Sequence, residues 1–236
     1  MSVENASTKD ACIIMFVRLP ERGSVKTRLA RALDEEATLG LYDRFVRDLL
    51  TTLHEGRFDI RICYYPPDAG EEVAGWLGRE RRYVSQRGRD LGERLANAFT
   101  DAFADGFHRV VIIGSDSPDL PVAILKDALK FLKTTDASDA VIGPANDGGY
   151  YLIGFRSERF LGTVFEGIEW GTERVFARTL DIFAEAGWRV HVLPRWRDVD
   201  TMDDLKAFFD AHRDDPPGAL QTLDYLRTQL GWDAST

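Results

Sequence analysis

The stretch ACIIMFVRLPERGSVKTRL, residues 11–29, joins an apolar run to a turn and then to a basic segment. Its first seven residues are apolar, which indicates a buried strand, here predicted at 12–17. Pro20 and Gly23 mark a turn, and Ser24 is of the type that caps a helix. The stretch therefore predicts a strand, a turn and a helix that starts near residue 25, which is the opening unit of an α/β sheet.

The rest of the chain repeats this alternation of strands and helices. Further strands are predicted at 58–65, 82–85, 109–113, 139–143, 150–155 and 188–193. Helices are predicted at 25–54 with a break near 33–34, and at 70–77, 90–105, 121–133, 172–186, 201–212 and 217–230. The alternation predicts a single α/β domain with a mostly parallel central sheet and helices on both faces. We expect this domain to span 1–236, with residues 1–10 flexible and 217–236 forming a C-terminal helical tail.

The bulk composition excludes several classes of function. Lys and Arg number 30 against 39 Asp and Glu, and the resulting net charge of −9 argues against a general nucleic-acid binder. Cys12 and Cys63 both lie in apolar runs, so neither a disulfide framework nor a zinc site is expected. The first ten residues are polar, and no apolar run approaches the length of a membrane helix. We expect a cytoplasmic protein that binds neither nucleic acid nor membrane.

The loop after the first strand is basic, but it is not a P-loop. That motif needs glycines six residues before its lysine and directly before it, and here Pro20 and Val25 stand at those positions. A weaker interpretation remains, in which Arg18, Lys26 and Arg28 together with free N–H groups at a helix start bind an anion. The alternative is that Ser24 simply caps a helix whose first turn is basic and exposed.

The segment VVIIGSDSPDLP, residues 110–121, carries the first candidate metal ligand. Asp116 follows a buried strand between small residues, and ligands of open α/β sheets bind beyond the carboxyl ends of strands. A carboxylate in this position suits Mg²⁺ or Mn²⁺, which commonly use one or two protein carboxylates together with substrate phosphates. The alternative is an aspartate that only stabilises its own turn. Asp119 directly precedes a helix and is expected to cap it.

A second acidic segment, WRDVDTMDDL at 196–205, follows the last predicted strand. Asp198 and Asp200 point to one side if the segment is extended, where the two carboxylates repel unless a cation lies between them. That cation is a metal bound by Asp200, with Asp198 as a further possible ligand, or it is simply Arg195 or Arg197 nearby.

Three other segments supply weaker candidates. In GPANDGGYYLIGF, residues 143–155, Asp147 is a candidate base or substrate ligand, and Gly148 and Gly149 would let a substrate approach; a simple hairpin explains the same residues. Gln86 and Arg89 precede a helix where they could meet a base or diphosphate, or merely be solvated. Glu169 is a second candidate base, and Trp170 could stack on a ring, although packing is the plainer explanation for this tryptophan.

Five ordered motifs resemble those of a known family. They are FVRLPERGSVKTRLARAL, GSDSPDLP, DGGYYLIGF, EWGTERVF and DVDTMDDL. Over roughly residues 12–210 the chain is similar to small bacterial GT-A-like glycosyltransferases of the nucleotide-diphospho-sugar transferase superfamily, some relatives of which are linked to arsenosugar biosynthesis. The nearest functional neighbours of that family are molybdenum-cofactor and phospholactate guanylyltransferases. The resemblance implies a GT-A-like fold.

The resemblance also implies roles for the candidate residues. The first loop, with Arg18, Gly23, Lys26 and Arg28, would bind nucleotide phosphates. Asp116 would take the place of the metal-binding acid of the DxD motif, and Asp200 would complete the metal site from the far side.

Two departures from the family pattern affect these roles. A full DxD motif would need an acid at residue 114 or 118, where this chain has Gly114 and Pro118, so the contribution of Asp200 becomes more important. Glu21 and Arg22 separate the proline and glycine of the first loop, which places an acid beside the expected phosphate site.

The function expected first is metal-dependent transfer of a sugar from a nucleotide-diphospho-sugar to a small acceptor, with Mg²⁺ or Mn²⁺ stabilising the leaving nucleotide. Lys26 and one or more arginines would share the negative charge, and Asp147 or Glu169 would serve as base. The alternatives are nucleotidyl transfer from a nucleoside triphosphate to a small phosphorylated acceptor and an idle nucleotide-binding module. The sequence leaves the oligomeric state open.

Overall fold

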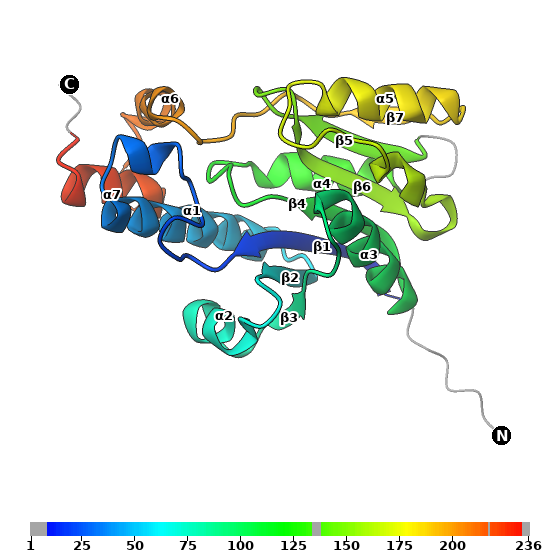
Figure 1. Cartoon of the computed structure of the whole chain (residues 1–236), viewed down its shortest axis with the longest axis horizontal. Coiled ribbons are helices and arrows are strands. Elements are labelled where there is room, and N and C mark those ends of the chain that lie inside the picture. The colour runs from blue at the N-terminus through cyan, green and yellow to red at the C-terminus, as the bar shows by residue number, and fades with distance from the viewer. Residues whose placement is uncertain (1–8, 134–137, 217, 233–236) are drawn as a thin grey trace.

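Seven strands form one sheet in the order β3-β2-β1-β4-β6-β5-β7 within the described residues of this computed structural model, which are 9–133, 138–216 and 218–232 (Figure 1). The strands are β1 Lys9–Arg18, β2 Ile60–Tyr65, β3 Arg82–Ser85, β4 Phe107–Ile113, β5 Ala140–Pro144, β6 Tyr150–Arg156 and β7 Val190–Val192. β6 runs antiparallel to both of its neighbours, and all other pairs are parallel. The six parallel strands therefore end at the same edge of the sheet.

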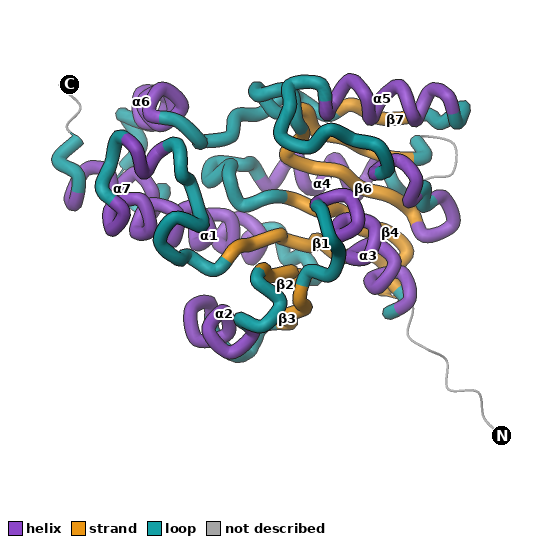
Figure 2. The backbone as a smooth tube through the Cα atoms, in the orientation of Figure 1, coloured by secondary structure: helices purple, strands orange, loops and turns teal. Residues whose placement is uncertain are grey.

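Helices cover both faces of this sheet (Figure 2). They are α1 Glu35–Glu55, α2 Gly70–Leu77, α3 Leu91–Ala104, α4 Val122–Phe131, α5 Val175–Glu185, α6 Met202–His212 and α7 Gln221–Gln229, with 3-10 turns η1 Leu29–Arg31, η2 Ser157–Arg159 and η3 Gly162–Phe165. One core cluster joins α1, α2 and α4 to the sheet, and a second joins α3, η3 and α5 to the opposite face. The central strands are buried on both sides, which explains why β1 reads as a continuous apolar run.

A third cluster of apolar side chains attaches the C-terminal helices to the outer side of α1. Leu41 and Phe45 of α1 pack with Leu29 of η1 and with side chains of α6 and α7. Asp48 accepts hydrogen bonds from the backbone N–H groups of Gln221 and Thr222 at 2.7 and 2.9 Å, which caps the start of α7. This packing brings the segment before α6 close to the loop that follows β1.

The predicted strands and mostly parallel α/β sheet are confirmed, but the first helix starts later than expected. The prediction placed its start near residue 25, whereas α1 begins at Glu35 and is capped by Asp34, which accepts from Ala37 N at 2.7 Å. Lys26 has a φ of 47°, a left-handed conformation that a right-handed helix excludes. The buried residues Val25 and Leu29 imitate helical spacing because the loop itself is anchored by apolar side chains.

Both chain ends differ in part from the expectation. Lys9 and Asp10 belong to β1, although flexibility was predicted for 1–10, and residues 1–8 lie outside the described part of the chain. The predicted C-terminal helix is present as α7, while 217 and 233–236 are outside the description. None of the described helices is long and apolar enough to cross a membrane.

Candidate active site

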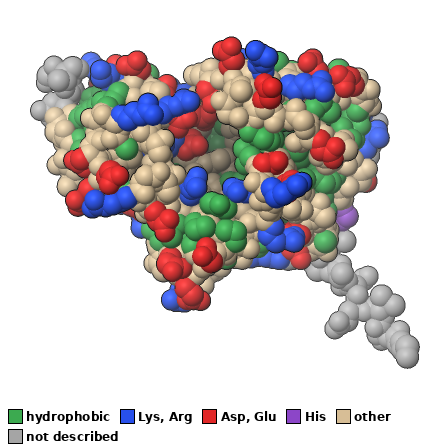
Figure 3. All heavy atoms as spheres, in the orientation of Figure 1, with side chains coloured by type: hydrophobic (Ala, Val, Ile, Leu, Met, Phe, Trp, Pro, Cys, Tyr) green, Lys and Arg blue, Asp and Glu red, His purple; other side chains and the backbone are tan. Residues whose placement is uncertain are grey.

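A cavity of about 370 Å³ opens where the parallel strands end. Its lining comes from the ends of β1, β2 and β4, the start of β6 and the first turns of α3. Figure 3 shows the molecule hollowed near its centre, with acidic side chains in the hollow and basic side chains along its lower rim. Gly114 has no heavy atom within 4 Å of where a Cβ would be, so a ligand can pass close to the backbone there. This edge is where α/β sheets of this type bind ligands.

Lys26, Asp116 and Asp200 meet beside this cavity. The Lys26 Nζ atom lies 2.5 Å from Asp116 Oδ1 and 2.7 Å from Asp200 Oδ1. The lysine side chain is 3% exposed, whereas the two aspartate side chains are 46% and 36% exposed. The ammonium therefore lies beneath two carboxylates that face solvent. Three residues proposed from separate sequence motifs form one ionic cluster.

The charge of Lys26 is maintained by these two acids. Burial disfavours the ammonium, but the attraction of Asp116 and Asp200 outweighs burial and raises the pKa of Lys26 above its ordinary value. The cluster of one ammonium and two carboxylates has a formal charge of −1. Lys26 thus neutralises protein carboxylates in this structure, where the sequence had led us to expect nucleotide phosphates.

Side chains of the loop that carries Lys26 hold its conformation through hydrogen bonds and burial. Ser24 Oγ donates to Glu21 O at 2.7 Å and accepts from Glu21 N at 3.2 Å, so Ser24 closes a turn and caps no helix. Val25 and Leu29 are buried on either side of Lys26. The left-handed backbone at Lys26 costs about 1–2 kcal/mol, and these anchors hold it there.

Asp200 and Asp198 reach the cluster through a backbone contact. Val199 N donates to Asp116 O at 2.9 Å, which holds the two acids on either side of Val199 next to Asp116. Ser117 Oγ donates to Asp198 Oδ1 at 2.8 Å. Burial and, after it, repulsion from Asp116 raise the pKa of Asp198 to about 7. Asp198 is therefore able to take or release a proton near neutral pH.

The arginines considered as the cation between these acids lie elsewhere. Arg195 Nη1 donates to Ala145 O at 2.7 Å, and Arg197 Nε lies 3.5 Å from Asp119 Oδ2. Lys26 is the cation that contacts Asp200, and its second partner is Asp116 rather than Asp198.

Asp119 does not cap the following helix as predicted. The N-cap of α4 is Pro121, and Asp119 Oδ1 instead accepts from Trp196 Nε1 at 2.9 Å. His212 Nε2 lies 3.0 Å from Asp119 Oδ2. The Asp119 side chain is 3% exposed. It fastens the segment that carries Asp198 and Asp200 to the loop that carries Asp116.

Tyr42 connects the first loop to the loop after β4. Its hydroxyl accepts from Arg18 N and lies 3.0 Å from Ser115 Oγ. Burial and the negative charge of Asp116 raise the pKa of Tyr42 to about 12, so the phenol stays protonated. No feature of the sequence marked Tyr42, because it lies within an ordinary amphipathic helix.

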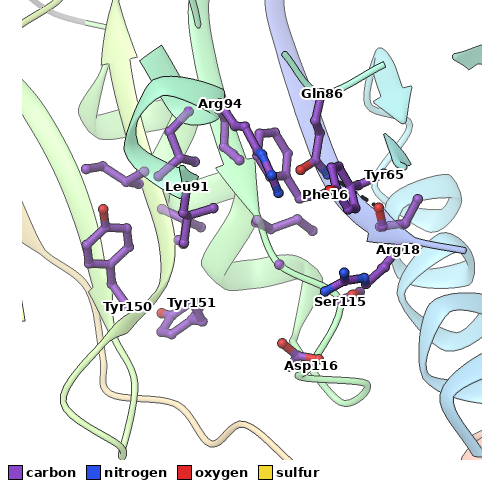
Figure 4. Close-up of a pocket in the computed structure, with 17 residues that line it drawn as sticks. Phe16, Arg18, Tyr65, Gln86, Leu91, Arg94, Ser115, Asp116, Tyr150 and Tyr151 are labelled. Atoms are coloured by element: carbon purple, nitrogen blue, oxygen red, sulfur yellow. Dashed lines mark hydrogen bonds between the residues drawn. The ribbon is translucent and has the colours of Figure 1, made fainter. Parts of the chain in front are cut away.

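Two arginines that line the cavity, Arg18 and Arg94, have no ion pair with any acid in the described residues. The guanidinium carbons of Arg94 and Arg18 lie 4.1 and 5.1 Å from the centre of the Tyr65 ring (Figure 4). Arg94 also donates to Gly88 O at 3.3 Å. The sequence pointed to Arg18 but missed Arg94, because one more arginine on an amphipathic helix carries no distinguishing pattern. These cations are the ones available to an anionic ligand.

Gln86 lines the cavity as a buried residue. Its Nε2 donates to Cys63 O at 2.9 Å and to Val17 O at 3.3 Å. Since both amide hydrogens are used, the amide oxygen is the part of the side chain that a ligand's donor can meet. Arg89, expected to act beside it, is exposed and paired with Glu93, and it is absent from the residues that line the cavity.

Other residues expected to bind phosphate also lie outside the cavity lining. Arg28 is exposed and Gly23 has a φ of 70° in the turn of the first loop. Because α1 starts only at Glu35, this loop offers no helix N-terminus for an anion. The helix-dipole part of the sequence argument is wrong here.

The glycines after Asp147 form a hairpin turn, and Gly148 packs closely against neighbouring backbone. β5 and β6 form the hairpin that was the alternative interpretation, and Asp147 Oδ1 accepts from Gly149 N at 2.8 Å across its turn. A Cβ on Gly148 would lie 2.2 Å from Glu173 O, so this glycine fits closely against the backbone just before α5. Asp147 itself is exposed, and its negative charge contributes to the raised pKa of Asp198.

Glu169 and Trp170 are not brought to the cavity lining. Glu169 is exposed, and its carbonyl accepts from Thr172 Oγ1 at 2.8 Å. Trp170 packs edge-on against Tyr150, with ring centres 6.2 Å apart, as part of the second core cluster. Packing, the plainer explanation, accounts for this tryptophan.

The acidic cluster fits a divalent cation that arrives with other ligands. Asp116 and Asp200 already share one cation, the Lys26 ammonium, and their oxygens are the hard donors that Mg²⁺ and Mn²⁺ prefer. Among the described residues, no group of three or more His, Cys, Asp or Glu side chains could hold a metal by itself. The two carboxylates therefore match the usual Mg²⁺ arrangement in which substrate phosphates and water complete the shell.

Comparisons with known proteins agree with this architecture. The chain is 27% identical over 213 residues to 2-phospho-L-lactate guanylyltransferase of Methanocaldococcus jannaschii, covering 89% of this chain and 85% of that protein. It is 41% identical to a nucleotide-diphospho-sugar transferase-like protein of Desulfovibrio desulfuricans G20, whose crystal structure covers 94% of this chain and 96% of its own with a TM-score of 0.88.

A more distant structure shows the fold alone. Rv0371c of Mycobacterium tuberculosis H37Rv, crystallised in complex with manganese, is 18% identical with a TM-score of 0.50 and covers 85% of this chain and 98% of its own.

Residues 49–172, more than half of the chain, match the family described as an uncharacterized protein conserved in bacteria, DUF2064. The chain has a nucleotide-diphospho-sugar transferase-like fold and belongs to the DUF2064 family.

Proposed function

We propose that this protein is a divalent-cation-dependent transferase that acts on a nucleoside phosphate, and that nucleotidyl transfer is its reaction. The observation that carries this proposal is the convergence of Lys26, Asp116 and Asp200 beside a cavity that Arg18 and Arg94 also line. Carboxylates that can share a cation, together with nearby arginines that have no acidic partner, form a site for phosphate groups.

The chain's own residues divide the work in this reaction. Asp116 and Asp200 hold Mg²⁺ or Mn²⁺, which would supply neutralisation of the phosphate oxygens and of the leaving group. Arg18 and Arg94 bind phosphate oxygens, and Gln86 meets the nucleoside. An acceptor oxygen attacks the α-phosphorus, the bond from that phosphorus to the bridging oxygen breaks, and pyrophosphate leaves.

Two observations favour nucleotidyl transfer over glycosyl transfer. The curated relative that spans most of the chain is a guanylyltransferase. A lysine from the loop after the first strand, directly beside the acids, also suits charge that develops at an α-phosphate. Glycosyl transfer from a nucleotide-diphospho-sugar is the second candidate, favoured by the name of the 41% identical protein from Desulfovibrio desulfuricans.

A thermal-shift panel tests nucleotide binding first. The purified protein is heated with each of the four nucleoside triphosphates and with nucleotide-diphospho-sugars, with Mn²⁺ or with EDTA. A ligand at 100 times its Kd stabilises the native state by about 2.7 kcal/mol, which for a chain of this size raises the Tm by roughly 5–10 °C. We expect such a rise with Mn²⁺ and a much smaller one with EDTA. If none of these nucleotides gives a metal-dependent rise, the proposal fails.

Site variants and product analysis then separate the candidate reactions. Asp116→Asn and Arg94→Met should each remove most of the shift, whereas Arg89→Met, which alters an exposed arginine outside the cavity, should keep it. With a panel of small hydroxylated and phosphorylated acceptors, pyrophosphate release from a nucleoside triphosphate supports nucleotidyl transfer. Release of a nucleoside diphosphate from a nucleotide sugar instead supports glycosyl transfer.

A further inference from the structure

The ammonium of Lys26 stands where a cation shared by Asp116 and Asp200 would be held. Its nitrogen contacts one oxygen of each carboxylate, at 2.5 and 2.7 Å. The same two carboxylates are the donors assigned above to Mg²⁺ or Mn²⁺. A lysine ammonium is a compact point charge that can occupy the position of such an ion, but it carries half the ion's charge.

This arrangement makes metal binding without nucleotide unfavourable. With Lys26 in place the three groups carry a formal charge of −1, so the carboxylates attract a dication far less than an unpaired pair would. A dication would also lie within a few ångströms of the ammonium, because both would contact the same two carboxylates. The repulsion is strong because the Lys26 side chain is almost completely buried.

Nucleotide phosphates change this balance. Their oxygens bring negative charge to the side of the cluster that is open to solvent, where the Asp116 and Asp200 side chains are 46% and 36% exposed. The lysine side chain is long and its ammonium has three donors, so Lys26 can exchange a carboxylate for a phosphate oxygen while keeping its charge satisfied.

We propose that Lys26 is an internal counter-ion that keeps the Asp116–Asp200 pair closed to a free divalent cation and releases it to a cation that arrives with nucleotide phosphates. This inference rests on the proposed function. It gives Lys26 a positioning role in addition to its contact with phosphate, and it predicts that cation and nucleotide bind with positive coupling.

The test measures Mn²⁺ binding in the absence of nucleotide, with the free ion detected by its electron paramagnetic resonance signal. Lys26→Met should bind Mn²⁺ about tenfold more tightly than the parent protein or better, because two carboxylates then lose their internal cation. Lys26→Arg retains the charge and should bind as weakly as the parent. Lys130→Met, which removes an exposed lysine at the far end of α4, is the matched control and should leave the Kd within about twofold.

Folding is controlled independently. Lys26→Gly is measured beside Lys26→Met, because glycine suits the positive φ at this position and also lacks the ammonium. Asp116→Asn in the Lys26→Met background should abolish the gain, which ties it to this pair of acids. A folded Lys26→Met or Lys26→Gly protein that binds Mn²⁺ no more tightly than the parent would overturn the proposal.

The outcomes separate this inference from the proposed function. Tighter Mn²⁺ binding by the variants without any nucleotide-dependent thermal shift in the parent supports Lys26 as a counter-ion to the two acids, but refutes its release by nucleotide together with the transferase. A metal-dependent nucleotide shift in the parent with unchanged Mn²⁺ affinity in the variants refutes the counter-ion and leaves the transferase standing.

Discussion

Replacing Asp198 with asparagine should stabilise the metal-free protein, and more so as the pH rises. Burial and the charge of Asp116 raise the pKa of Asp198 from an ordinary value of 3.8 to about 7. The folded protein therefore holds a proton on this carboxyl between these pH values while the unfolded chain does not, and stability is lost as the pH rises through this window. A pKa difference of about 3 between the folded and unfolded states corresponds to a destabilisation of the folded protein by roughly 4 kcal/mol. This destabilisation is complete above pH 7 and absent below about pH 4.

Asparagine removes the charge but keeps an oxygen that can accept from Ser117 Oγ, which now donates to Asp198 at 2.8 Å. The free energy of unfolding is measured by urea denaturation at pH 4 to 8 in EDTA, for the parent and for Asp198→Asn. We expect the two proteins to differ by less than about 1 kcal/mol at pH 4 and by up to about 4 kcal/mol in favour of the variant at pH 8. Asp181→Asn, an exposed change of the same charge on α5, should follow the parent at every pH. Parallel pH curves for the parent and Asp198→Asn would refute this account of Asp198.

Two further substitutions test the packing that places the site. Gly148→Ala should lower the free energy of unfolding by at least about 2 kcal/mol, because the new Cβ meets Glu173 O and the backbone has a φ of 91°. Gly75→Ala is the control, since no heavy atom lies within 4 Å of its new Cβ, and it should be neutral or stabilising in the same thermal melt. Equal melting of both variants would contradict the argument. Asp48→Ala should cost about 1–3 kcal/mol by leaving the start of α7 uncapped, with faster amide hydrogen exchange confined to that helix, and unchanged exchange there would count against the capping role.

The parts of the fold that could be predicted are those with a local cause. Strands such as β1 and β4 are buried on both faces, so their apolar runs are visible in the sequence, and α3 shows one apolar stripe. The first helix was misplaced because Val25 lies in a loop and Leu29 in the short turn η1, where four-residue spacing of apolar residues does not mean an α-helix. The left-handed φ of Lys26 carries no sequence signature, since lysine rarely adopts it.

Candidate site residues could be predicted where they follow a strand. Asp116 after β4 and Asp200 after β7 both satisfied the rule that ligands bind at the carboxyl ends of parallel strands, and the structure brings them together. Arg94 was missed because it lies on a helix and becomes relevant only through its contact with Tyr65. The close contact of Gly148 with Glu173 could not be predicted, because the space over a glycine depends on which distant backbone lies there.

The sequence by itself determined the order of strands and helices, the parallel sheet and the edge at which chemistry was to be sought, because burial and turns leave periodic, local traces. Tertiary structure alone decided what Lys26 contacts. Asp200 is 174 positions away from it, and no local pattern reports the charge that a distant segment delivers. The lysine looked like a phosphate ligand in isolation, and the fold paired it with two carboxylates because a buried ammonium needs opposite charge within contact distance.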